Sequence, residues 1–156
     1  ARILILCLSV LASSRQFFDA RSGIFNALMG VFGVDAKNYM GFIYDSIYEI
    51  VDQYPETFAK EDINAVLTAF CESYDETAEQ QVWFDNLKAI ADRLGFCSDM
   101  KAYKAEPEKY KGSIADVSMF LRVAVTGKMN SPDLYEVMNI LGKDRVLARI
   151  NAVIGG

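Results

Sequence analysis

Lysines and tyrosines alternate in one polar stretch of this 156-residue chain, between Phe96 and Ser113. Aromatic rings stack on unpaired bases and lysine amines meet phosphates, so this pattern is typical of contact with single-stranded nucleic acid. It is equally typical of a surface loop whose tyrosines pack on neighbouring helices, and the stretch by itself leaves both interpretations open. The residues concerned are Lys101, Tyr103, Lys104, Lys109, Tyr110 and Lys111.

The sequence offers no catalytic side chains of the usual kinds. Histidine is absent, which excludes Ser-His-Asp and Cys-His catalysis and any histidine-ligated metal site. Cys7, Cys71 and Cys97 lie far apart and form no zinc-binding pair. We therefore expect three reduced thiols in the cytoplasm, no catalytic residue and no metal site.

Charge is distributed unevenly along the chain, whose net charge is −5. Residues 1–100 hold 7 Lys/Arg and 15 Asp/Glu, which gives −8, whereas residues 101–156 hold 9 and 6, which gives +3. A basic region on an acidic body can meet phosphate locally. The total charge therefore does not exclude a nucleic-acid partner.

Apolar residues recur at helical spacing along most of the chain, and no segment keeps the two-residue period of a strand. The fold class that this predicts is all-α, with helices over 39–50, 63–70, 77–94, 113–126, 131–141 and 143–153. We expect Thr77 and Ser131 to be N-caps, with Pro132 in the first helical position. The helix over 77–94 should bury Val82, Trp83, Leu87, Ile90, Ala91 and Leu94, and Gly95 should end it. A boundary between an N-terminal helical lobe, 1–74, and a C-terminal lobe, 75–156, is expected at the polar segment before Thr77.

The apolar run Ile3–Ala12 follows Arg2 and precedes two serines, a pattern that also occurs in signal peptides. It is too short to span a membrane as a helix. We interpret it as a buried helix or as a surface that packs on a neighbouring domain. Because the chain begins with Ala1, we expect a fragment or a processed product.

Three motifs follow one another near the end of the chain: FLRVAVTG from Phe120, SPDL from Ser131 and LGKDRVL from Leu141. Together they resemble the C-terminal end of bacterial glutamyl-tRNA synthetases. Trp83, the Leu94-Gly95 pair and the spacing Tyr103, Pro107, Tyr110-Lys111-Gly112 also look like that family. The resemblance covers roughly 75–154, fades across 39–74 and does not extend to 1–38.

The resemblance implies an α-helical anticodon-binding region of a class I aminoacyl-tRNA synthetase, built of two small lobes. In that family the anticodon bases are splayed out and read by the C-terminal lobe. Arg122 matches the base-contacting arginine, and Ser131, Pro132 and Leu134 match the turn that lies against the anticodon. Met119 stands where relatives use Gln. The lysines expected along the tRNA backbone are Lys101, Lys104, Lys109, Lys111 and Lys128.

The ATP-binding motifs of class I synthetases are missing from this sequence, so we expect no enzyme activity from it alone. ATP and Mg²⁺ would serve the catalytic domain of the parent glutamate–tRNA ligase, and this part would need no cofactor. The expected partner is tRNA-Glu, with or without tRNA-Gln, and the expected state is a cytoplasmic monomer with no membrane contact. Two alternatives stay open: Arg122 pairs with Asp116 or Asp144 while Ser131 only caps a helix, or the chain is a helical protein-interaction domain.

Overall fold

The computed structural model describes residues 41–43, 45 and 48–156 of the chain. Packing divides the chain into two compact units, Ala1–Tyr48 and Glu49–Gly156. The predictions for residues 1–38, including the apolar run Ile3–Ala12, lie outside the described residues. All of the candidate site lies in the second unit, which is described below.

Within the described residues the chain forms six α-helices, two 3-10 helices and no strand, which confirms the all-α class. The only strand-like pairing there is an isolated bridge between Cys97 and Ser113. The elements are η1 (Gly41–Ile43), α5 (Lys60–Ser73), α6 (Gln80–Arg93), α7 (Met100–Ala105), η2 (Pro107–Lys109), α8 (Ile114–Thr126), α9 (Leu134–Leu141) and α10 (Lys143–Gly155).

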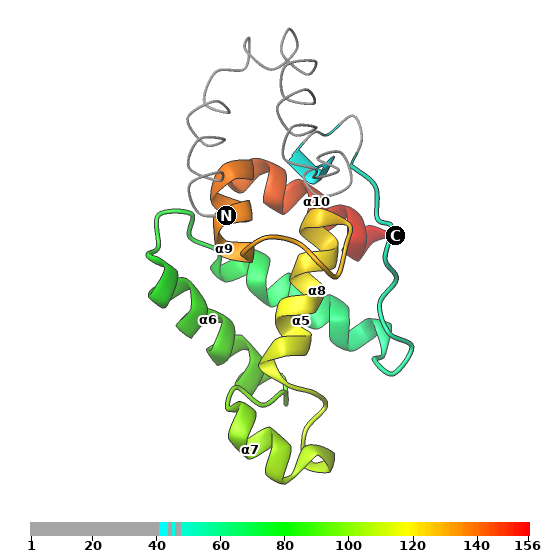
Figure 1. Cartoon of the computed structure of the whole chain (residues 1–156), viewed down its shortest axis with the longest axis vertical. Coiled ribbons are helices and arrows are strands. Elements are labelled where there is room, and N and C mark those ends of the chain that lie inside the picture. The colour runs from blue at the N-terminus through cyan, green and yellow to red at the C-terminus, as the bar shows by residue number, and fades with distance from the viewer. Residues whose placement is uncertain (1–40, 44, 46–47) are drawn as a thin grey trace, which may run out of the picture. The chain divides into compact units, whose positions relative to one another are not determined.

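Helix α8 is the centre of the second unit and packs against α5, α6, α9 and α10. Its apolar residues are so numerous that it is buried on most sides, as a helix with little polar surface must be. Phe120 is fully buried, and its ring packs edge-on against Phe58, with ring centroids 5.0 Å apart, and against Phe96, 5.9 Å apart. Figure 1 shows α7 toward one end of α8 and α9 toward the other.

Helix α5 packs against α6, α8 and α10 within the same unit. Its buried residues Ile63, Val66, Leu67 and Phe70 recur at the spacing that predicted this helix. The division by packing therefore falls between Tyr48 and Glu49 rather than at the lobe boundary that we expected near residue 74.

The polar stretch between Phe96 and Ser113, which we call the excursion, leaves the helical core and returns to it at the same place. Its two ends are joined by backbone hydrogen bonds from Cys97 N–H to the carbonyl of Gly112, at 2.9 Å, and from Ile114 N–H to the carbonyl of Cys97, at 2.8 Å. Between them lie α7 and η2, which the sequence did not predict because α7 buries no residue and so carries no periodic apolar signal. Asp99 starts α7 by accepting a hydrogen bond from Lys101 N–H at 2.7 Å.

Three helix predictions are wrong in detail. Helix α6 begins at Gln80, and Thr77 does not cap it, because the Thr77 amide and hydroxyl both donate to the carboxylate of Asp75. Val82 is 59% exposed and Leu94 is only half-buried, whereas Trp83 and Leu87 are buried as expected. The expected helix over 39–50 does not reach Ile50, because residues 48–50 are not helical, and the next residue, Val51, donates its N–H to the carbonyl of Gly127.

Candidate nucleic-acid interface

Arg122 lies on the last turns of α8, where the chain leaves the helix for the loop that leads to α9. Its Nη1 donates to the Ser131 carbonyl at 3.0 Å, to the Ser131 hydroxyl at 2.8 Å and to the Pro132 carbonyl at 2.9 Å. These bonds close the loop over 127–133 against α8. The expected alternative, a pairing of Arg122 with Asp116 or Asp144, is not what the structure shows.

All of these hydrogen bonds are made by one nitrogen of the Arg122 guanidinium, Nη1. In the described part of the chain, neither Nε nor Nη2 of Arg122 donates a hydrogen bond. These two nitrogens form the flat edge with which arginine binds planar pairs of acceptors, such as a carboxylate, two phosphate oxygens or the edge of a base. Because Nη1 is already held, this edge is orientated before any ligand arrives, which lowers the entropy cost of binding.

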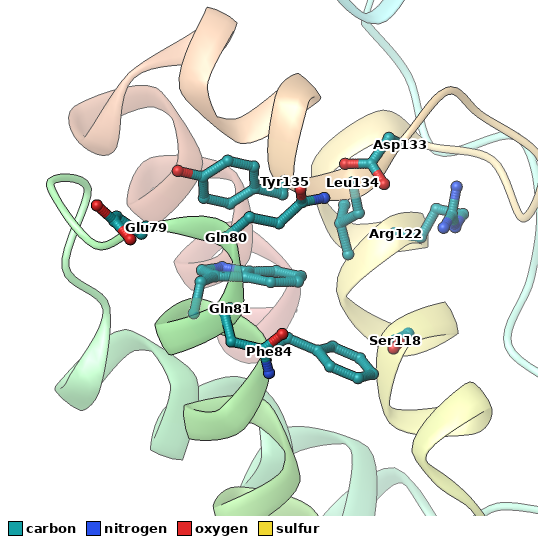
Figure 2. A pocket seen from close by; sticks show the side chains of 10 residues that line it. Glu79, Gln80, Gln81, Phe84, Ser118, Arg122, Asp133, Leu134 and Tyr135 are labelled. Carbon is teal, nitrogen blue, oxygen red and sulfur yellow. The ribbon is translucent and has the colours of Figure 1, made fainter.

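A hollow of about 610 Å³ lies between α6, α8 and the start of α9. Figure 2 shows the Phe84 ring of α6 pointing toward α8 near Ser118, with Asp133, Leu134 and Tyr135 closing one side, and the Arg122 guanidinium turned away from the side chains of α6. The size is in the range of small-ligand pockets. Its lining residues are Glu79, Gln80, Gln81, Trp83, Phe84, Ser118, Arg122, Asp133, Leu134 and Tyr135.

The structure brings together four of the five residues that we expected to meet the anticodon. Arg122 and Leu134 line the hollow, and Ser131 and Pro132 hold Arg122. Pro132 and Leu134 are buried, so their part is to shape the turn rather than to present a polar group. Met119 lies one helical turn before Arg122 on α8 and is half-buried, but it does not line the hollow.

Ser131 and Pro132 do not start α9, and this prediction is wrong. The N-cap is Asp133, whose carboxylate accepts a hydrogen bond from Glu136 N–H at 3.1 Å. The Ser131 hydroxyl is engaged elsewhere, since it accepts from Arg122 and donates to the Pro132 carbonyl at 3.0 Å. Aspartate and serine cap helices about equally well, so the sequence Ser-Pro-Asp did not decide between them.

Aromatic residues around the hollow were missed as site residues by sequence reasoning. The rings of Trp83 and Tyr135 lie 5.8 Å apart, and the Tyr135 hydroxyl donates to the Ala78 carbonyl at 2.8 Å. Phe84 is half-buried and carries the Lys88 amine 4.7 Å from its ring centroid. At helical spacing such residues read as ordinary core positions, and only their place beside Arg122 distinguishes them.

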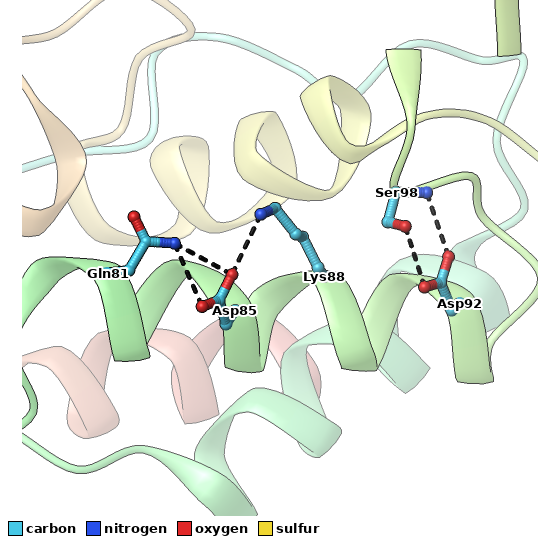
Figure 3. Close-up of polar contacts among 5 residues, drawn as sticks. All are labelled: Gln81, Asp85, Lys88, Asp92 and Ser98. Carbon is cyan, nitrogen blue, oxygen red and sulfur yellow. Dashed lines mark hydrogen bonds and ion pairs between the residues drawn. The ribbon is translucent and has the colours of Figure 1, made fainter. Parts of the chain in front are cut away.

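The outward face of α6 carries its own polar contacts, as Figure 3 shows. Asp85 accepts hydrogen bonds from Gln81 at 3.1 Å and from Lys88 at 3.0 Å. These bonds, that from Gln81 first, hold the pKa of the Asp85 carboxyl below its usual range. In the last turn of the helix, Asp92 accepts hydrogen bonds from the amide and hydroxyl of Ser98, which lies beyond the helix end. This face therefore orders α6 and the start of the polar excursion.

The expected backbone-contacting lysines lie away from Arg122, with one exception. Lys101 and Lys104 are exposed on α7, at the opposite end of α8. Lys109 pairs with Glu106 at 3.0 Å, and Lys111 pairs with Asp62 at 2.6 Å. Lys128 is the exception, because it lies in the loop between Arg122 and Ser131.

The tyrosines of the excursion contact each other, with the ring centroids of Tyr103 and Tyr110 6.4 Å apart. Both are half-buried, which agrees with the packing interpretation of this stretch. Among residues 41–43, 45 and 48–156, no group of three His, Cys, Asp or Glu side chains is placed to hold a metal ion. None of the helices described there is both long and apolar enough to cross a membrane.

The chain is similar to several bacterial proteins named glutamate–tRNA ligase. It is 36% identical over 116 residues to the protein from Acetivibrio thermocellus, covering 74% of this chain and 21% of the relative. It is 42% identical over 118 residues to that from Sorangium cellulosum, with coverage of 74% and 21%. For Clostridium perfringens, strain 13, the identity is 38% over 96 residues, with coverage of 62% and 18%.

The chain therefore spans about a fifth of the length of the curated relatives it matches. No solved structure matches it at a significant level. The family model described as "Anticodon binding domain" matches residues 32–154, a range that includes Arg122, the α8–α9 loop and the hollow. The chain thus belongs to the anticodon binding domain family and is homologous to the C-terminal region of bacterial glutamate–tRNA ligases.

Proposed function

We propose that this chain binds transfer RNA and reads the anticodon of tRNA-Glu as the C-terminal part of a glutamate–tRNA ligase. The observation that carries the proposal is the guanidinium of Arg122, a residue that lines the hollow: it is anchored through Nη1, and its Nε and Nη2 donate no hydrogen bond within the described residues. The family match supports the choice of ligand.

The chemistry of the hollow favours a base over a phosphate. Glu79 and Asp133 place carboxylates at its edge, and these repel a phosphate but accept hydrogen bonds from the amino group of a base. Phe84 and Tyr135 offer aromatic surface on which an unstacked base can lie. The free edge of Arg122 can donate to ring nitrogen and carbonyl acceptors of the same base.

In this proposal the catalytic step lies in another domain of the ligase, which binds ATP and Mg²⁺. The chain described here needs no cofactor, acts as a monomer and works in the cytoplasm. Its partner is tRNA-Glu. A site that is less selective for the anticodon would also accept tRNA-Gln.

The decisive experiment is to measure the dissociation constants of the 156-residue chain for tRNA-Glu, tRNA-Gln and a tRNA-Glu transcript whose anticodon has been substituted. We expect Arg122→Ala to reduce the preference for the native anticodon by about 1–3 kcal/mol, the range of a lost bidentate base contact. Arg122→Lys should not restore the preference, because an ammonium lacks the flat pair of donors.

Arg93→Ala is the matched control, because it removes an exposed arginine from the far end of α6. It should leave the preference for the native anticodon unchanged. If Arg122→Ala weakens both transcripts equally, or neither, then Arg122 is structural and does not read the anticodon. If the wild-type chain binds none of the tRNAs, a protein-interaction domain becomes the better explanation.

A further inference from the structure

The loop that holds Arg122 is itself bound by a segment from much earlier in the chain, Glu49–Asp52, which we call the strap. Val51 and Asp52 both donate their N–H groups to the Gly127 carbonyl, at 2.9 and 3.0 Å. Oδ2 of Asp52 also accepts a hydrogen bond from Met129 N–H at 2.6 Å, across 77 positions of sequence. The strap thus fixes two successive points of the loop over 127–133.

The fit between strap and loop is close enough to constrain the sequence. Gly127 has φ of +77°, which favours glycine, and a Cβ added there would overlap the carbonyl oxygen of Glu49. The contact between strap and loop therefore requires glycine for two independent reasons.

On its other side the same loop is bound by α8. The Thr126 hydroxyl donates to the Arg122 and Lys128 carbonyls, at 2.8 and 3.0 Å, and Arg122 donates to Ser131 and Pro132. Met129 lies between these two sets of bonds and is 41% exposed. Its amide is held by the Asp52 carboxylate, which makes Asp52 the group that holds the middle of the loop.

We propose that Asp52 is a positioning residue for anticodon reading. By holding the Met129 amide, it keeps Ser131 and Pro132 where their carbonyls anchor Nη1 of Arg122, two and three residues further on. Asp52 acts through the loop and makes no base contact itself. This inference rests on the proposed function, because it concerns how selectively the site reads its ligand.

Because Asp52 is negatively charged, its removal has two effects on tRNA binding that can be measured separately. A carboxylate near an RNA-binding surface repels phosphate, so its removal should on charge alone strengthen the binding of every tRNA. Loss of the loop anchor should instead reduce the preference for the native anticodon. The two effects are separable because only the second depends on the anticodon sequence.

The experiment compares Asp52→Ala, Asp52→Asn and the control Glu56→Ala in the complete chain. Glu56 is an exposed carboxylate on the segment that follows the strap, so its removal changes the charge equally without touching the loop. Two quantities are measured: the ratio of dissociation constants for native and anticodon-substituted tRNA-Glu, and hydrogen exchange of the Met129 amide without RNA.

We expect Asp52→Ala to lower the preference for the native anticodon about fivefold, as for one lost hydrogen bond to an anchor, and to speed Met129 exchange. Asp52→Asn keeps an oxygen acceptor and should lie between Asp52→Ala and the wild type. Glu56→Ala should change neither quantity. If Asp52→Ala does not fold, the same two quantities are measured for Asp52→Asn, which should show a smaller change in the same direction.

The inference is overturned if the folded Asp52 variants keep the wild-type preference, or if Met129 exchange stays as slow as in the wild type. If the wild-type chain itself does not distinguish the two transcripts, the proposed function has failed, and the inference falls with it. A wild-type chain that distinguishes them while the Asp52 variants do so equally well refutes the inference alone.

Discussion

Two arginines near the end of α8 have different structural roles. Arg149 of α10 is only 6% exposed, and its Nη1 donates to the Val125 carbonyl at 2.7 Å. Arg122 makes bonds of the same kind to Ser131 and Pro132 but is half-buried and lines the hollow. A helix C-terminus needs donors for its last carbonyls, and Arg149 supplies one. Arg122 closes a loop through Nη1, and its Nε and Nη2 donate no hydrogen bond within the described residues, so under the proposed function it is the arginine whose loss should change selectivity.

Tyr74 is a residue whose buried polar group does not help the fold. Its hydroxyl is buried without a hydrogen-bond partner among the described residues, and its ring stacks on Phe70 with centroids 5.0 Å apart. Burial, with the nearby Glu76 carboxylate contributing, raises the pKa of Tyr74 from 10.0 to about 12. The folded state therefore favours the neutral phenol.

We predict that Tyr74→Phe leaves the free energy of unfolding at pH 8 unchanged or raises it by up to about 1 kcal/mol, since an unpaired hydroxyl is removed from the core. The unfolded phenol ionises near pH 10 and the folded one near pH 12, so the wild type loses stability as pH rises from about 10 to about 12. The variant should lose less over that interval. Urea unfolding at pH 8 and pH 11 measures both effects, and a large loss of stability at pH 8 would contradict the prediction.

At the scale of elements, the α8–α9 loop is the part on which the site depends most. Gly127 ends α8 in a left-handed conformation, and its carbonyl receives both strap amides. Gly95 ends α6 in a similar way, with φ of +86°, but a Cβ there would meet only the Lys111 side chain at 3.7 Å. The two glycines share the backbone requirement and differ in their surroundings.

We predict that Gly95→Ala costs about 1–2 kcal/mol of unfolding free energy, which is the cost of a left-handed residue with a Cβ. Gly127→Ala should cost clearly more, about 3 kcal/mol or above, because the added Cβ also overlaps the strap backbone. Chemical denaturation of both variants measures the difference. Equal losses of unfolding free energy in the two variants would mean that the strap backbone moves away from the added Cβ without destabilising the fold, and that the strap does not constrain the loop.

At the scale of the whole second unit, α8 separates two places where nucleic acid is expected. The Arg122 side of the hollow lies at its C-terminal end, and Lys101 and Lys104 lie beyond its N-terminal end. A helix of 13 residues is about 20 Å long. A ligand that meets both places must therefore follow the length of α8, as the backbone of an RNA stem and loop can.

We predict that Lys104→Ala weakens native and anticodon-substituted tRNA equally and makes the salt dependence of binding shallower. A phosphate contact carries no sequence information, and each one contributes about 0.7–0.9 to the slope of log K against log salt. Lys60→Ala removes an exposed lysine from the start of α5 and serves as the control with an unchanged slope. A preference for one anticodon that changes with Lys104→Ala would refute this role.

Much of the helical framework could be predicted from the sequence because its signals are local. The spacing of Ile114, Val117, Leu121 and Val125 predicted α8, and all four are buried. Gly95, Gly127 and Gly142 marked helix ends, and each has positive φ. The motifs around Arg122 and Leu141 predicted the family, which the comparison over residues 32–154 confirmed. Periodicity, glycine and short motifs act over a few residues, so one sequence suffices to read them.

The tertiary structure decided what the site residues contact. Whether Ser131 or Asp133 caps α9 depends on Arg122, which takes the Ser131 hydroxyl from nine positions away. The hollow joins residues of α6, α8 and α9, and the strap reaches Met129 across 77 positions. Such contacts leave no periodic trace in the chain, because they depend on how helices pack and where a loop closes. Sequence alone therefore determined the all-α class, the helices with a periodic apolar face and the family of this protein, whereas only the packed fold decided how Arg122 is held and what lies beside it.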